Sequence, residues 1–425
     1  MRGFAAGRSA VRKLLALGAS LVALAGCGPT GRIEVIHPQG SDAARSLFRV
    51  AMTQQITVPD NFVMRPDEFG TVAFDHPRQL LYVGSREGTL MALDMQTGEF
   101  MWELPLGGAV ASDPLMVDLP RETVKAIGAP KDLLLVGTDN GEEIAVDLDT
   151  REELWRYATD GKVRRAPVVA EGVVHVANSR DQVYGLDLRT GAWRWQYEQP
   201  LQTGFTVAGY AGLAYRPSSD GAVPGVLYTG FGNGKVAALD AGSGEALWLA
   251  SVAPTGGGDF SDCDTTPLVD AERNRLYVAG QQTGVYALSL DDGSVQWSFE
   301  VRAAGDLVWS AGTDLVAASS LEGIFSLDRD GMLLWRTEVD PGVVSRPLVV
   351  ADTVYVAHNE SGLIALDRDT GEFLARVDPG SGVSSPPVFD AVMNRVYATS
   401  NRGVLYGLEL VDPVPMLPAD DFASL

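Results

Sequence analysis

The feature that most constrains this chain is a tryptophan that recurs four positions after a tight-turn residue. Successive copies are 38 to 53 residues apart. Self-similarity at this period is typical of repeat architectures in which each unit is one small sheet. The tryptophan copies are Trp102, Trp155, Trp195, Trp248, Trp297 and Trp335, and a seventh copy, GEFLA at 371–375, carries Ala375 in the tryptophan position.

Each unit contains four strand-like segments, and turns such as DMQTG, DLRTG, DAGSG and DRDTG join the last two. The aspartate of such a turn caps backbone N–H groups, and the glycine takes the left-handed conformation. The sequence therefore predicts an all-β fold, an eight-bladed β-propeller of four-stranded antiparallel blades. The expected blades are 69–104, 110–157, 164–198, 204–252, 263–301, 304–339, 343–378 and 383–410.

Two of these turns depart from the pattern. Arg151 stands in the glycine position of the second repeat, where a positive φ costs a side chain about 1 kcal/mol. The sixth turn, at 328–331, is one residue shorter than the others. We expect a rearranged turn at these places and no lost blade.

The eighth unit holds only three strands before Leu410, and the acidic, proline-rich segment 411–425 is expected to be a tail. A closed ring leaves no sheet with a missing strand, because its edge would be unpaired. Residues 46–58, SLFRVAMTQQITV, are apolar and β-branched enough to supply it. We therefore expect the propeller to span 46–410, with this N-terminal strand closing blade 8.

The repeated tryptophans are interpreted as packing residues. An indole buries on the order of 150–250 Å², which suits the seam between two blades. A cofactor-stacking role for one of them is the alternative. Because the position recurs around the ring, packing is favoured.

The first residues have the composition of an export signal. Arg2, Arg8, Arg12 and Lys13 precede an apolar run from Leu14, so residues 1–26 are interpreted as a signal peptide. Leu24-Ala25-Gly26-Cys27 resembles a bacterial lipobox, which implies that Cys27 is lipidated and that 27–45 form a flexible tether. An ordinary cleavage site with a chance cysteine is the alternative. Gly28 replaces the usual inner-membrane retention aspartate, which favours the outer membrane.

Charge and composition exclude several classes of function. The chain has 33 Lys and Arg against 55 Asp and Glu, a net charge of −22, which argues against nucleic acid as a partner. Its four histidines lie in different units without ligand spacing, so we expect no metal, no cofactor and no catalytic residues. With Cys27 acylated, Cys263 has no disulfide partner.

The strings ALDMQTGEFMW and GLDLRTGAWRW resemble the tryptophan-docking motif of quinoprotein-type, or PQQ-like, eight-bladed propellers. Two groups share that motif, the quinone-dependent dehydrogenases and the BamB family of outer-membrane lipoproteins. The chain has no adjacent cysteine pair of the kind found in many of those dehydrogenases. Its lipobox and compact length resemble the BamB family over 24–410.

A second string, SDCDTTP at 261–267, is similar to a BamB segment that contacts a POTRA domain of the barrel-assembly protein BamA. The resemblance implies a partner-binding role for Asp262 and Asp264, together with Thr265. It also implies one for Leu201, although the family's Leu-x-Leu-Arg motif keeps only its first leucine here. The alternative is that these residues only cap an inner strand, as SRP does at 345–347.

One basic cluster interrupts the acidic sequence. Lys162, Arg164 and Arg165 lie together before the third blade. They fit either an electrostatic contact with an acidic partner or an ordinary solvated loop.

The resemblance implies a non-catalytic scaffold of the outer-membrane β-barrel assembly (BAM) machinery, monomeric within a complex with a BamA-like protein. The expected location is the outer membrane, with a lipid anchor and the propeller in the periplasm. Two alternatives remain open, a lipoprotein propeller that binds another partner and a PQQ-dependent dehydrogenase.

Overall fold

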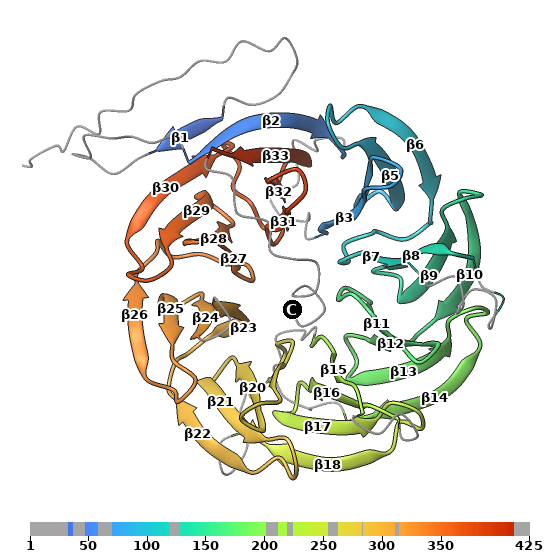
Figure 1. Cartoon of the computed structure of the whole chain (residues 1–425), viewed down its shortest axis with the longest axis vertical. Helices are drawn as coiled ribbons and strands as arrows, with labels where there is room; N and C mark the ends of the chain where they lie inside the picture. The colour runs from blue at the N-terminus through green and yellow to red at the C-terminus, as the bar shows by residue number, and fades with distance from the viewer. Residues whose placement is uncertain are drawn as a thin grey trace, which may run out of the picture.

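The computed structural model describes residues 33–36, 47–57, 70–118, 128, 130–200, 211–218, 224–253, 262–282, 284–310 and 314–411. Eight antiparallel sheets stand around a central axis, and the chain passes through them in order (Figure 1). The eight-bladed propeller predicted from the sequence is confirmed. Within the described residues no helix is long and apolar enough to cross a membrane.

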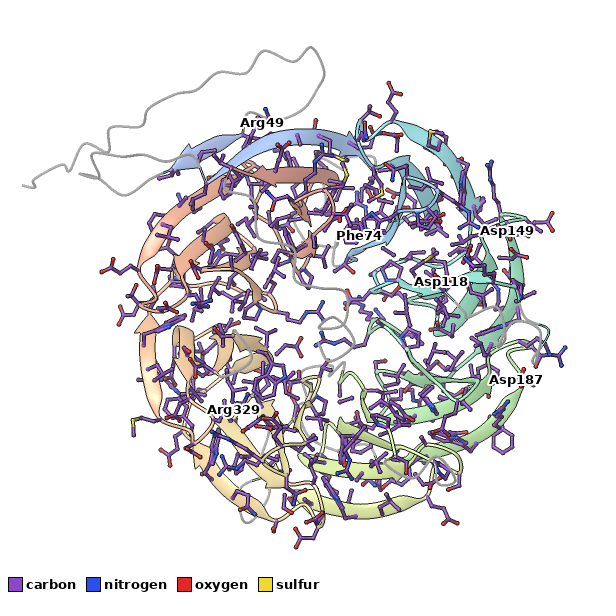
Figure 2. The ribbon with its side chains drawn as sticks, viewed as in Figure 1. Arg49, Phe74, Asp118, Asp149, Asp187 and Arg329 are labelled. Carbon is purple, nitrogen blue, oxygen red and sulfur yellow. The ribbon has the colours of Figure 1, made fainter. Side chains whose placement is uncertain are left out.

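The first strand of each blade lies nearest the axis and the fourth lies at the perimeter (Figure 1). Figure 2 shows Phe74 on an inner strand, with Asp149 and Asp187 at the outside of the ring. The strands of blades 1 to 4 are β3 (Val72–Asp75), β4 (Leu80–Gly84), β5 (Thr89–Asp94), β6 (Phe100–Pro105); β7 (Leu115–Asp118), β8 (Asp132–Gly137), β9 (Glu142–Asp147), β10 (Glu152–Ala158); β11 (Val168–Ala170), β12 (Val173–Ala177), β13 (Gln182–Asp187), β14 (Trp193–Glu198); β15 (Ala214–Arg216), β16 (Val226–Gly230), β17 (Lys235–Asp240) and β18 (Ala246–Ser251).

The second half of the ring repeats this plan. The strands of blades 5 to 8 are β19 (Leu268–Asp270), β20 (Arg275–Gly280), β21 (Gly284–Ser289), β22 (Val295–Phe299); β23 (Ala304–Ser310), β24 (Asp314–Ser319), β25 (Gly323–Leu327), β26 (Leu333–Thr337); β27 (Leu348–Val350), β28 (Thr353–His358), β29 (Gly362–Asp367), β30 (Phe373–Asp378); β31 (Val388–Asp390), β32 (Arg395–Thr399) and β33 (Val404–Leu410).

The ring has two rims because the blades are antiparallel meanders. We call the turn rim the side that carries the hairpins between first and second strands and between third and fourth strands. The linker rim carries the hairpins between second and third strands and the segments that connect successive blades. The DxxTG turns therefore lie on the turn rim, and loop 262–267 lies on the linker rim.

Blade 8 is closed by the N-terminal strand, as the sequence predicts. Strand β2 (Phe48–Gln55) pairs antiparallel with β33, with Phe48 opposite Leu410 and Gln55 opposite Val404. Met52 of β2 is buried and lies under the turn of blade 1, where a Cβ on Gly98 would be 2.7 Å from its Cε. Met52 thus fills the position that a tryptophan takes in other seams.

One strand lies where the sequence predicts only a tether. Strand β1 (Glu34–Ile36) pairs antiparallel with β30 and makes blade 7 five-stranded. The expectation that 27–45 is entirely a flexible tether is therefore wrong at 34–36. Three residues are too few to show the alternation by which strands are recognised. Ile33 and Val35 pack on the cluster that contains Phe48 and Ala375.

The core is divided into clusters between neighbouring blades, and the tryptophans contribute to most of them. Trp195, for example, is 5% exposed and packs under Gly244 of the next blade, where a Cβ would lie 2.4 Å from its ring. The indole Nε1 then donates to a turn carbonyl of that next blade. These hydrogen bonds are Trp155 to Leu188 O at 2.9 Å, Trp195 to Ala241 O at 3.1 Å, Trp248 to Leu290 O at 2.9 Å, Trp297 to Arg329 O at 3.0 Å and Trp335 to Arg368 O at 2.7 Å.

The two unusual turns behave differently. Arg151 has φ 60° and donates its N–H to Asp147 O at 2.8 Å, as the glycine turns do, so the rearrangement expected there is not found. The surrounding turn outweighs the modest cost of the left-handed backbone. The shorter turn closes one residue earlier, with Gly331 N donating to Asp328 O at 3.1 Å.

Candidate functional site

Loop 262–267 is held between blades 4 and 5 on the linker rim. Cys263 N donates to Phe231 O at 3.1 Å, and Gln281 N donates to Asp262 O at 3.1 Å. The Cys263 thiol is buried, and burial raises its pKa, so it stays protonated and unreactive. The loop is therefore a fixed part of the seam.

Two of the predicted contact residues point inward. Asp262 has no exposed surface and Thr265 has 1%. The Thr265 hydroxyl donates to Ala279 O and accepts from Ala279 N, each at 3.0 Å. Ser385 makes the equivalent pair of bonds to Thr399 in blade 8. The Thr265 hydroxyl thus fastens the loop to β20, the second strand of blade 5, and Asp262 is buried beside it.

Asp264 is the carboxylate of this loop that keeps part of its surface exposed. Burial raises its pKa to about 6, and the nearby Asp306 and Asp262 add to the effect, while Arg165 opposes it. A carboxylate that is costly to ionise gains from a cation brought by a partner. Asp264 is therefore suited to receive a basic side chain at this rim.

An ion pair next to Asp264 crosses the central opening. Arg165, before β11 of blade 3, lies 2.6 Å from Asp306 on β23 of blade 6. Thr266 N of the candidate loop also donates to Asp306, at 2.9 Å. Because blades 3 and 6 are not neighbours, the pair joins two sides of the ring.

A second pair crosses the opening in the same way. Arg346 of blade 7 lies 3.5 Å from Asp113 of blade 2, which also accepts a hydrogen bond from the Thr71 hydroxyl at 2.9 Å. Burial would lower the pKa of Arg165, but Asp306, Asp113 and Asp264 outweigh it and raise that pKa. The opening is thus lined by paired charges, of which Asp306 is buried and the other three are partly buried.

Of the four residues in these two ion pairs, the sequence singles out only Arg165, as part of the basic cluster, and Asp113, Asp306 and Arg346 were missed. Asp113 and Arg346 directly precede a proline that leads into an inner strand, and Arg165 stands one residue further back. The repeated position before the inner strand was the available signal, since it places side chains around one axis.

The basic cluster is neutralised within the protein. Lys162 lies 3.0 Å from Asp139, and Arg164 makes two bonds to the same carboxylate at 2.7 and 2.6 Å. Burial would raise the pKa of Asp139, but the two cations lower it. With Arg165 paired to Asp306, the cluster holds the linker rim together instead of forming a free basic patch.

Two of the site residues expected from the sequence, Leu201 and Cys27, lie outside the described residues. Among the residues that the structure describes, no group of three or more His, Cys, Asp or Glu side chains could hold a metal ion. The fold thus brings Asp262, Asp264 and Thr265 together on one loop and adds Arg165 and Asp306 to them.

Comparison with known proteins identifies the family. A family model described as "Outer membrane protein assembly factor BamB" matches residues 63–119, 117–330 and 284–412. The chain belongs to this family. A BamB of Shewanella oneidensis is 27% identical over 321 residues, covering 74% of this chain and 78% of the relative.

Solved structures agree on the fold. BamB from Moraxella catarrhalis superposes with a TM-score of 0.67 at 19% identity, covering 85% of this chain and all of that one. A quinohemoprotein alcohol dehydrogenase from Comamonas testosteroni reaches 0.60 at 14% identity, covering 88% of this chain and 78% of that one. At these identities the two likenesses establish the propeller alone, so the BamB family rests on the sequence match.

Proposed function

We propose that this protein is a non-catalytic scaffold of the outer-membrane β-barrel assembly machinery. The observation that carries the proposal is the BamB family match, which runs through all eight blades from residue 63 to residue 412. The relatives are named as outer membrane protein assembly factors. Two ion pairs that cross the central opening stabilise the ring, which is consistent with a binding platform.

The proposed partner is a POTRA-type domain of a BamA-like protein, bound at the linker rim around Asp264. Two features support this site, the partly exposed carboxylate with its raised pKa and the fixed backbone of loop 262–267. A rigid loop limits the entropy lost on binding. Asp262 and Thr265 would position the loop, and Leu201 would add an apolar contact.

The proposed location is the periplasmic side of the outer membrane, with a lipid on Cys27 as the anchor. Several acyl chains hold a protein firmly, whereas one chain binds marginally. The acidic surface supplies no attraction to anionic head groups, so the lipid would carry the attachment.

A tagged full-length protein purified from its own membranes in mild detergent tests the proposal. We expect an Omp85-family protein to co-purify. Asp264→Ala should lower its recovery about tenfold, which corresponds to a contact of about 1.4 kcal/mol. Asp369→Ala removes the same charge from the turn rim and is the matched control.

The outcomes separate the alternatives. Failure of the unaltered protein to retain any Omp85-family protein contradicts the assembly role and favours another partner. Retention that is equal in both variants keeps the assembly role and removes the Asp264 site. Dye-linked alcohol oxidation after addition of quinone and calcium would instead support a dehydrogenase.

A further inference from the structure

Strand β1 fastens the N-terminal segment to the perimeter of blade 7, ahead of the ring-closing strand. Val35 is opposite Val377 and Ile36 is opposite Arg376 on β30. Ile33 and Val35 also pack on the hydrophobic cluster at the seam between blades 7 and 8. The segment is therefore attached by both backbone pairing and apolar contact.

The direction of β1 decides where the preceding chain leaves the ring. Glu34 is opposite Asp378, the residue at which β30 ends and the linker to blade 8 begins. Because the pairing is antiparallel, β1 runs from the linker rim toward the turn rim. Residue 33, which precedes β1, therefore lies at the linker-rim edge of blade 7.

The attachment also sets how far the ring can lie from an anchor. Six residues separate Cys27 from Ile33, a span of at most ~20 Å when fully extended. Without β1 the first attached residue would be Phe48, and 21 residues span up to ~70 Å. Strand β1 thus shortens the reach by about a factor of three.

We propose that β1 mounts the ring on the bilayer with the linker-rim edge of blade 7 facing the lipid surface. The inference rests on the proposed lipid anchor at Cys27. Blade 3, opposite blade 7 in the ring, is then held farthest from the membrane (Figure 1). Loop 262–267 of blade 5 lies on the same rim, two blades from the mount, and stays open to a partner.

The charges near β1 give the protein surface no attraction of its own for the lipid head groups. Arg49 projects from the perimeter beside β1 (Figure 2) and is paired with Glu409 at 2.7 Å. A net charge of −22 opposes binding to anionic head groups. The orientation therefore depends on β1 and on the short chain before it.

Fluorescent labels on single introduced cysteines test the mount. The lipidated full-length protein is reconstituted in phosphatidylethanolamine and phosphatidylglycerol vesicles that contain a nitroxide-labelled lipid. Glu360→Cys and Arg180→Cys place labels at equivalent exposed hairpins on the linker rim of blades 7 and 3. Asp369→Cys places one on the turn rim of blade 7. Cys263 is buried and does not compete for label.

We expect the label at position 360 to be quenched severalfold more than those at 180 and 369. Val35→Pro, which removes β1 pairing, should make the three values nearly equal while the protein still floats with the vesicles. Equal quenching in the unaltered protein, or an unchanged pattern in Val35→Pro, overturns the mount alone. A protein that does not float overturns the anchor and the mount together.

Discussion

Blades 2 and 4 follow the same four-strand plan but differ at two equivalent positions. In blade 4 the turn position holds Gly244, and the start of the third strand holds Val236, opposite Gly230. In blade 2 these positions hold Arg151 and Glu143, with Glu143 opposite Gly137. One blade follows the repeat pattern and the other breaks it twice.

The turn position decides how deeply a tryptophan of the preceding blade is held. Trp195 reaches under Gly244 and donates to Ala241 O. Trp102 meets Arg151 instead, whose guanidinium carbon lies 5.9 Å from the ring centre. Its Nε1 is buried and has no hydrogen-bond partner within the described part of the chain. The turn keeps its shape, and the lost hydrogen bond is exchanged for a cation–π contact.

The position at the start of the third strand places the carboxyl group of Glu143 in the interior of the protein. Glu143 is fully buried, and neither carboxylate oxygen has a hydrogen-bond partner among the described residues. Burial raises its pKa to about 8, so it is held in the protonated form at neutral pH. The ring therefore tolerates single departures from the repeat pattern, because each blade is supported by both neighbours.

Removal of the Trp195 indole should have the largest effect on the free energy of unfolding. Trp195→Ala is expected to lower the free energy of unfolding by about 4 kcal/mol. The change creates a cavity and leaves the Ala241 carbonyl without its hydrogen-bond donor. Trp102→Ala should cost only about 2 kcal/mol because its indole N–H already lacks a partner. Denaturant unfolding of the two variants measures the difference, and equal losses would contradict the comparison.

The buried Glu143 should make the free energy of unfolding depend on pH. The unfolded chain releases the Glu143 proton near its ordinary pKa of 4.5, whereas the native chain holds it to about 8. The free energy of unfolding therefore falls as pH rises between these values. Glu143→Leu should raise stability by about 2 kcal/mol at pH 8 and much less at pH 5.

Glu143→Gln is the control, because it removes the titration and keeps the polar group. It should lose the pH slope and gain little stability at pH 5. Unfolding curves at pH 5 and pH 8 for the unaltered protein, Glu143→Leu and Glu143→Gln measure these differences in stability. The interpretation fails if the slope survives in Glu143→Gln.

Restoration of the turn glycine should have the smallest effect. Arg151→Gly relieves a left-handed backbone but loses the contact with Trp102, so we expect a net gain below about 1 kcal/mol. Thermal unfolding should show a slightly raised midpoint. A loss of more than about 1 kcal/mol would show that the cation–π contact outweighs the strain.

The sequence predicts the fold well where a physical rule repeats. The tryptophan spacing gives the length of the repeat, and the repeated strand pattern gives the number of blades. The missing fourth strand of blade 8 identifies 46–58 as its source. Strand β1 could not be predicted, because three residues carry no period. The geometry of Arg151 was also missed, since local preference is weaker than the surrounding turn.

The candidate site is harder to predict for a different reason. The resemblance indicates loop 262–267, but burial of Asp262 and Thr265 depends on how blades 4 and 5 meet. Arg165 and Asp306 are 141 positions apart and meet only because the ring closes. Such contacts follow from topology and leave no local pattern.

The pairing of β2 with β33 joins the two ends of the ring without a covalent bond, which has a mechanical consequence. A force applied to the chain ahead of β2 would act on the pairing of β2 with β33, on which closure of the ring depends. Strand β1 comes first along the chain and passes the load into the sheet of blade 7. The pairing of β1 with β30 would therefore shield the pairing of β2 with β33 from force applied to the N-terminal segment.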